Sequence, residues 1–185
     1  MKKMISVALI LVMTLLMLTG CAADGTTGAT AAPATEPVKP ALTDSLETII
    51  DRIYEQQSVE FAIGTIPVDL TDTTEDGLWA LKSYTGLDSA DQITEAAVSE
   101  AMIGSIPYSL VLVRVADGAD AQTVAEAMKA GIDQRKWICV EANSLQVSGY
   151  GDVVMLVMIG SDYGSAQTFT DAFRTVCGGE LDFTI

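Results

Sequence analysis

The chain has 185 residues, with 10 Lys and Arg against 25 Asp and Glu, no His, and a mean hydropathy of +0.35. The absence of His excludes a Ser-His-Asp triad, histidine metal sites and imidazole acid–base chemistry, and the strong negative charge argues against a nucleic-acid partner. A chain of this length suits one domain with a tail.

Residues 1–20 have the pattern of a lipoprotein signal peptide. Lys2 and Lys3 make its start positive, and Ile5 to Leu18 form an apolar stretch too short to span a bilayer comfortably. This leader supplies about half of the summed hydropathy of the chain. Without it, 8 basic and 25 acidic residues remain, a charge of −17. The apolar character and the acidity therefore belong to different segments.

The leader closes with Leu18-Thr19-Gly20-Cys21, which resembles the bacterial lipobox. In that motif the peptide is cut before the cysteine, and the thiol receives a diacylglycerol. The resemblance implies a protein held at the extracytoplasmic side of the cell membrane by lipid on Cys21, because two or more acyl chains anchor a protein stably. The alternatives are an uncleaved anchor and an ordinary secretory cleavage site.

Residues 21–42 are predicted to be the lipidated cysteine and a linker, because residues 22–42 are almost entirely Ala, Thr, Gly and Pro. This composition buries too little apolar surface to offset the entropy of ordering, which indicates a flexible linker. Residues 43–185 are expected to form the globular domain. It opens with an amphipathic helix predicted over about 44–57, where apolar residues recur three and four apart.

A short second helix is predicted over about 74–84, with Leu78, Trp79 and Leu81 among its apolar residues. Residues 93–101 are compatible with either a strand or a helix. The clearest strand is 108–115, whose nearly continuous apolarity predicts cover on both faces. The later elements are a helix over 120–132, a short strand or bridge over 137–141, strands over 145–147 and 153–159 around a Gly-rich turn at 148–152, and a helix over 165–176. This order predicts a small single α+β domain with a mainly antiparallel sheet and about four helices.

One pattern occurs twice in the domain. Ile63-Gly-Thr-Ile-Pro67 returns forty residues later as Ile103-Gly-Ser-Ile-Pro107. The surrounding residues do not match. The repeated pattern is either a coincidence or a pair of similar loops that frame one cleft.

From Leu81 onward the chain resembles a family of short bacterial lipoproteins, found mostly in Gram-positive anaerobes, whose domain has no known function. The likeness is carried by residues 83–87, 108–118, 133–139 and 151–155. Arg135-Lys-Trp-Ile-Cys139 is its most specific stretch, and Gln134 stands where the family pattern is expected to have proline. The resemblance implies a lipoprotein context and a shared fold, and it supplies no activity.

Arg135, Lys136 and Trp137 are the first candidate binding residues, because they place two of the few basic side chains beside an aromatic ring. Together they suit an anion or carboxylate, with the guanidinium binding in bidentate fashion and the indole stacking. The alternative is a core Trp137 with two cations that offset a helix dipole and surface acids. We expect any binding surface around these three residues, Tyr108 and the repeated Ile-Gly-x-Ile-Pro segments.

Arg114 is a further candidate, because it interrupts an apolar strand on the same side as Leu110 and Leu112. If that side is buried, the guanidinium needs an acidic partner. The alternative is that it reaches solvent at the end of the strand.

Cys139 and Cys177 remain as thiols after lipidation, and export permits a disulfide between them. The alternative for Cys139, between Ile138 and Val140, is a small buried hydrophobic residue.

The expected function is a membrane-anchored binding or interaction module for a partner protein, a wall component or a small ligand. The sequence lacks Ser-x-x-Lys, Gly-x-Ser-x-Gly and P-loop motifs, and no metal or cofactor is expected. The alternative is a small His-free hydrolase that uses carboxylates or a Ser/Lys pair. A cleft that holds two close carboxylates with raised pKa values would favour that alternative.

Overall fold

Six strands form one sheet in the computed structural model, which describes residues 40–185. Their order is β1-β2-β3-β5-β4-β6, and each neighbouring pair is antiparallel. The elements are α1 Leu46–Gln56, β1 Ile63–Pro67, α2 Glu75–Thr85, β2 Ile93–Ala101, β3 Tyr108–Val115, α3 Ala121–Gly131, β4 Ser144–Tyr150, β5 Val153–Ile159, α4 Ala166–Cys177 and β6 Phe183–Thr184. The predicted α+β domain with a mainly antiparallel sheet and about four helices is confirmed.

The described part of the chain starts within the predicted linker. The predicted signal peptide, Cys21 and the linker as far as residue 39 lie outside it. Leu42, which the sequence assigned to the end of the linker, is buried in the core against α1. Within residues 40–185, no helix has the length and apolarity needed to cross a membrane.

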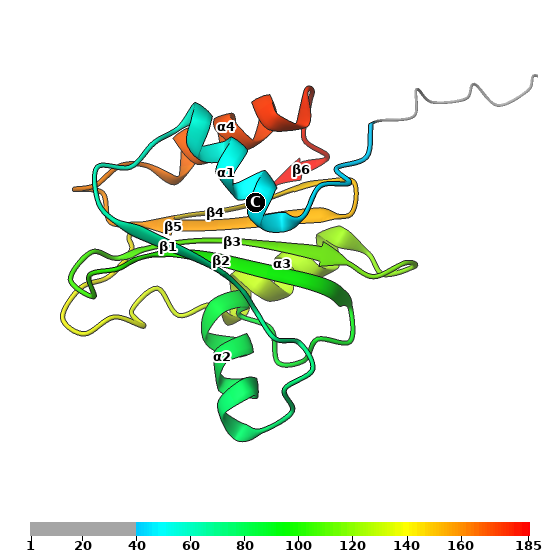
Figure 1. Ribbon diagram of the computed structural model, residues 1–185, viewed down its shortest axis with the longest axis horizontal. Helices are drawn as coiled ribbons and strands as arrows, with labels where there is room; N and C mark the ends of the chain where they lie inside the picture. The colour runs from blue at the N-terminus through cyan, green and yellow to red at the C-terminus, as the bar shows by residue number, and fades with distance from the viewer. Residues whose placement is uncertain (1–39) are drawn as a thin grey trace, which may run out of the picture. The chain divides into compact units, whose positions relative to one another are not determined.

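Helices cover both faces of the sheet, with α1 and α4 on one face and α2 and α3 on the other (Figure 1). Side chains alternate along β3, so Leu110 and Leu112 pack with α1 and α4, whereas Val111 and Val113 pack with α2 and α3. A strand buried on both sides is apolar at nearly every position. The expectation that 108–115 is covered on both faces is therefore confirmed.

The hairpin of β4 and β5 turns more tightly than predicted. The strands pair as far as Tyr150 and Val153, which leaves Gly151 and Asp152 in the turn. Gly151 has a φ of 59°, the left-handed backbone that two-residue hairpin turns require and that glycine adopts without strain. Gly and Ser at 148–152 are uncommon in strands, and for that reason the sequence assigned the whole segment to the turn.

A sixth strand that the sequence did not predict pairs with β4 at the edge of the sheet, where Gly149 lies opposite Phe183. A Cβ atom at Gly149 would overlap the Phe183 ring, so the glycine makes room for it. A two-residue strand has no measurable periodicity, and for that reason no pattern indicated β6.

The prediction of a short strand or bridge over 137–141 is wrong. The chain between α3 and β4 is an irregular loop, in which Cys139 has a left-handed φ of 71° that a β-strand does not contain. Gln134 organises this loop, because its side-chain Nε2 donates to the carbonyl oxygen of Ala142 at 2.6 Å and its own carbonyl accepts from the Ala142 N–H at 2.9 Å. These bonds across the loop outweigh the local strand preference.

The two ends of the sheet carry different structures (Figure 1). The start of the described chain and the β4–β5 turn lie at one end. At the other end lie three longer loops, which span residues 102–107, 132–143 and 160–165. The candidate site is built at the second end.

Candidate functional site

A hollow of about 360 Å³ lies between α2 and the loop that follows α3. We call it the basic hollow. The residues that line it are Trp79, Lys82, Ser83, Gly131, Asp133, Arg135 and Lys136. The ends of α2 and α3 approach closely here, because a Cβ atom at Gly131 would overlap the carbonyl of Gly86. Two glycines therefore bring Lys82 of α2 next to the loop that carries the other cations.

Basic residues concentrate at this hollow. Residues 40–185 contain 23 acidic and seven basic residues. The basic residues are Arg52, Lys82, Arg114, Lys129, Arg135, Lys136 and Arg174. Three of the seven line the basic hollow, together with a single acid, Asp133. The hollow thus concentrates the basic side chains of a strongly negative domain, and each of the three has an acidic partner outside the lining: Asp88, Glu141 or Glu100.

Arg135 is the accessible cation of the site. Its side chain is 79% exposed, and its Nε lies 3.4 Å from the carboxylate of Glu141. Its backbone N–H donates to the Asp133 carboxylate at 2.8 Å, which fixes the base of the side chain. An exposed ion pair of this kind is weak, so the guanidinium remains available for bidentate bonding to a ligand carboxylate.

Lys136, by contrast, is held inside the protein. Its Nζ lies 2.5 Å from Glu100 Oε1 and donates to the Ser83 carbonyl at 3.0 Å, and its side chain is 10% exposed. The rings of Tyr84 and Trp137 lie 5.5 and 5.3 Å from the Nζ. Burial lowers the pKa of Lys136, and the Glu100 carboxylate opposes that effect. Lys136 therefore joins the loop to α2 and β2 and holds the loop that carries Arg135 in position.

A Ser/Lys pair does form, because Lys136 Nζ donates to Ser109 Oγ at 3.3 Å. Ser109 lies on β3 and is completely buried, so a substrate carbonyl has no path to its hydroxyl. The lysine is also held by the Glu100 carboxylate and the Ser83 carbonyl. The geometry argues against the hydrolase alternative.

Carboxylates also give that alternative no support. The carboxyl groups of Asp69, Asp72 and Asp120 have pKa values below the ordinary aspartate value. Bonds from Thr71 and Thr74 lower the first two, and bonds from Thr123 lower the third. Each carboxylate shapes an exposed turn or a helix start, and a general acid would instead need a raised pKa.

Trp79 and Leu78 are exposed, contrary to their predicted place on the apolar face of the second helix. The Trp79 side chain is 69% exposed, whereas Leu81 is buried. Gly77, Leu81 and Thr85 form the buried stripe of α2, four residues apart. Leu81 is the only large apolar residue in this stripe, so the sequence gave little indication of which face turns inward. The exposed indole of Trp79 lies at the rim of the basic hollow.

Trp137 is partly buried against the core and borders a second hollow, of about 330 Å³. The walls of this hollow are Arg135, Trp137, Cys139, Val140 and Glu141. Arg135 lines both hollows, whereas Lys136 lines only the basic hollow and Trp137 only the second. The sequence missed Trp79 and Lys82, whose proximity depends on the contact between α2 and α3.

Tyr108 does not belong to this surface, which corrects its predicted place there. It is completely buried on the opposite face of the sheet, under α1 and α4. Its hydroxyl lies 2.8 Å from that of Tyr54, which donates to Ser99 Oγ at 2.7 Å. Burial raises the pKa of Tyr54 and raises that of Tyr108 well above the ordinary tyrosine value. These hydroxyls are structural, since buried polar groups require hydrogen-bond partners.

The raised pKa values of Tyr54 and Tyr108 predict a loss of stability in alkali. Above pH 10 the unfolded chain ionises its tyrosines while the folded chain keeps them protonated, so stability that is complete below pH 10 falls as the pH rises. One such tyrosine contributes about 1.4 kcal/mol per pH unit. Tyr54→Phe should make the slope of unfolding free energy against pH shallower above pH 10 in urea titrations. An unchanged slope would contradict the assignment, and the curves below about pH 9 supply the baseline.

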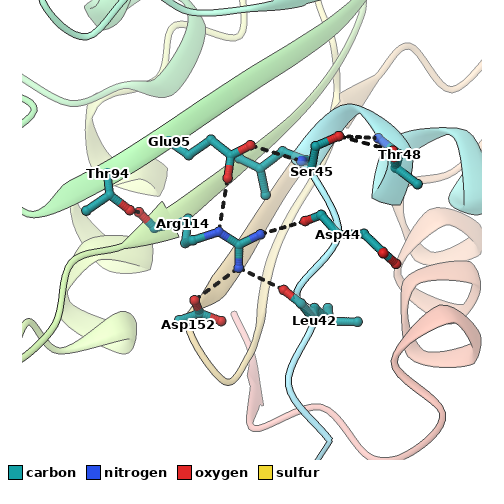
Figure 2. Close-up of polar contacts among 9 residues, drawn as sticks. Leu42, Asp44, Ser45, Thr48, Thr94, Glu95, Arg114 and Asp152 are labelled. Atoms are coloured by element: carbon teal, nitrogen blue, oxygen red, sulfur yellow. Dashed lines mark hydrogen bonds and ion pairs between the residues drawn. The ribbon is translucent and has the colours of Figure 1, made fainter.

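Arg114 lies at the far end of the sheet from the basic hollow, so its predicted role in binding is not supported. Figure 2 shows its guanidinium at the centre of a polar cluster, with 18% of the side chain exposed. Nε donates to Glu95 at 3.0 Å and Nη1 to Asp152 at 3.0 Å. Nη1 and Nη2 also donate to the carbonyl oxygens of Leu42 and Asp44, each at 2.8 Å.

The cluster around Arg114 meets the condition that a buried guanidinium needs acidic partners. Burial alone would lower the pKa of Arg114, and its bonds to Glu95 and Asp152 outweigh that effect and raise it. Glu95 also accepts from the backbone N–H of Leu46, at the start of α1, at 3.1 Å. Arg114 thus fastens the beginning of the domain to the sheet.

The candidate disulfide is not formed. Cys139 is exposed in the loop before β4, and Cys177 is buried on α4 in the core between α1 and the sheet. The alternative expectation, a buried Cys139, is also wrong, because Cys139 is exposed.

The two Ile-Gly-x-Ile-Pro segments have different structures. Residues 63–67 are the edge strand β1, whereas residues 103–107 lie in the loop between β2 and β3. They are not two similar loops that frame a cleft.

Comparisons of the chain with protein-family models, with curated proteins and with solved structures found no match. The resemblance to lipoproteins with a domain of unknown function stays a prediction, and the basic hollow is the basis for proposing a function.

Proposed function

We propose that this protein is a lipid-anchored extracytoplasmic binding module that holds a carboxylate-bearing ligand in the basic hollow. One observation carries the proposal: three of the seven basic residues between positions 40 and 185 line one hollow, next to an exposed tryptophan. A concave site with a few converging polar groups and an apolar face is the usual form of a ligand site.

Each accessible side chain has a distinct role in this proposal. Arg135 binds the carboxylate through two parallel N–H bonds. Lys82 adds positive charge, since its Nζ lies 2.6 Å from Asp88, whose side chain is 91% exposed, and this weak pair leaves the ammonium open to a second anion. Trp79 supplies a flat apolar face for the part of the ligand beyond the carboxylate.

Binding is expected to depend on the charge of the ligand and on Arg135. N-acetyl dipeptides with a free carboxylate should change the tryptophan emission of the full-length protein in detergent, because Trp79 borders the site. The matching C-terminal amides should bind about tenfold more weakly or worse, since a hydrogen bond to a charged group contributes about 1.5–3 kcal/mol. Arg135→Glu should abolish the response.

Lys129→Glu is the matched control for that variant. Lys129 is exposed on α3 and does not line the basic hollow, and its replacement changes the net charge by the same amount. It should bind as the unaltered protein does. Equal binding by the two variants, or equal binding of acids and amides, would show that long-range charge or apolar contact acts instead of a carboxylate site.

The anchoring part of the proposal depends on Cys21. Cys21→Ser is expected to move the protein from the membrane fraction to the soluble or secreted fraction, because the residue that would carry the acyl chains is lost. Immunoblotting of fractionated cells measures the shift. Retention of the variant in the membrane fraction would contradict lipid anchoring at this residue.

A further inference from the structure

The basic hollow belongs to a row of three hollows at the loop end of the sheet. The second hollow shares Arg135 with it, and a third, of about 210 Å³, shares Val140 and Glu141 with the second. Ligand pockets generally measure about 300–1,000 Å³. The basic hollow alone is near the lower limit, so the row accommodates a longer ligand than a single carboxylate.

Hydrogen bonds between loops fix the shape of the third hollow. Asn143 and Ser161 exchange two hydrogen bonds, from Asn143 Nδ2 to Ser161 Oγ at 3.0 Å and from the Ser161 N–H to Asn143 Oδ1 at 2.7 Å. The Gly160 N–H donates to the Pro107 carbonyl at 2.9 Å. These bonds join the three loops at this end of the sheet, so the hollow is preorganised and a ligand does not have to order it.

The charged side chains that line the first and third hollows differ in sign. The basic hollow contributes Lys82, Arg135 and Lys136 against Asp133. The third hollow contains Asp162 and Glu141, of which Glu141 pairs with Arg135, and no basic residue lines it. A ligand that complements both ends therefore carries an anion at one end and a cation at the other. A neutral oligosaccharide or a polyanion meets only part of this requirement.

From this polarity, and resting on the proposed function, we infer that the ligand is a peptide segment that carries a carboxylate and an amine a few residues apart. The carboxylate lies at Arg135 and Trp79, and the amine lies at Asp162, because Glu141 is already paired with Arg135. Peptide amide groups suit the polar wall between them, because Asn143 and the loop backbones offer donors and acceptors. The charges come either from the two termini of a short peptide or from Glu and Lys side chains within a longer chain.

A peptide array on the full-length protein in detergent tests this inference. One arm presents capped hexapeptides with one Glu and one Lys at increasing separation, and a second arm presents short peptides with free termini. In each arm, control peptides lack the carboxylate or the amine. At the best separation, removal of the amine should weaken binding by about two- to fivefold, as for an exposed ion pair. The arm with the stronger signal identifies the source of the charges.

The variant Asp162→Asn separates this inference from the proposed function. It should weaken binding of peptides with both charges by the same two- to fivefold factor and leave binding of carboxylate-only peptides unchanged. Arg135→Glu should abolish both. If peptides with and without the amine bind equally, and Asp162→Asn has no effect while Arg135→Glu does, the peptide inference fails and the carboxylate site stands. If Arg135→Glu also has no effect, or no peptide binds, both fail.

Discussion

Replacement of Arg114 by Met is expected to lower the free energy of unfolding by about 2–3 kcal/mol, because the largely buried guanidinium bonds to two carboxylates and two carbonyl oxygens at once, and hydrogen bonds to charged groups contribute about 1.5–3 kcal/mol. Glu95 and Asp152 would lose their cation, and the carbonyl oxygens of Leu42 and Asp44 would lose a donor. Arg114→Lys should restore only part of the loss, since an ammonium cannot reproduce the planar fork that reaches four groups. Urea denaturation followed by circular dichroism measures both variants.

Arg52→Met is the matched control for Arg114. Arg52 also contacts Asp44 and a backbone carbonyl, that of Val176, and its side chain is 40% exposed. Its removal should cost less than about 1 kcal/mol. Equal losses at Arg52 and Arg114 would show that the buried cluster in Figure 2 does not hold the start of the domain in place.

Replacement of Lys136 by Met is expected to lower the free energy of unfolding by about 3 kcal/mol, because the Glu100 carboxylate, which is 27% exposed, would remain without its cation. The double variant Lys136→Met and Glu100→Gln should cost less than the sum of the single variants by about 1–3 kcal/mol, since the two residues are in contact. A double-mutant cycle in urea measures this coupling.

The exposed pair of Lys82 and Asp88 supplies the comparison for that cycle. Its carboxylate is 91% exposed, and the coupling between the two residues should stay below about 1 kcal/mol. Additive effects at Lys136 and Glu100 would contradict the description of Lys136 as a buried support.

Much of the fold was predictable, because local patterns and the final packing agree. The helices over 44–57, 120–132 and 165–176 have clear apolar stripes, and the structure confirms each within a few residues. The strand at 108–115 and its two-sided cover were predicted from continuous apolarity, which survives any arrangement of the neighbouring elements. The loop at 137–141 was not predictable, because bonds between Gln134 and Ala142 override its local preference.

The candidate site was predictable only in part. Arg135, Lys136 and Trp137 stood out because cations are rare in this chain, and they line two adjoining hollows that share Arg135. Their separate roles were not visible, because exposure distinguishes Arg135 from Lys136 and the sequence does not contain exposure. Tyr108 was assigned to the site from its neighbourhood in the sequence. The two faces of β3 place it on the other side of the sheet from Lys136.

By itself, the sequence determined the properties that composition and local spacing contain: the acidity of the domain, the absence of histidine chemistry, the α+β class and the expectation of a lipidated Cys21. Only the tertiary structure decided which of the seven basic residues of 40–185 lie together. Lys82 and Arg135 lie more than fifty positions apart, and the close approach of Gly86 and Gly131 joins them. Such a contact depends on the packing of two helices on one sheet face, and no local pattern encodes it.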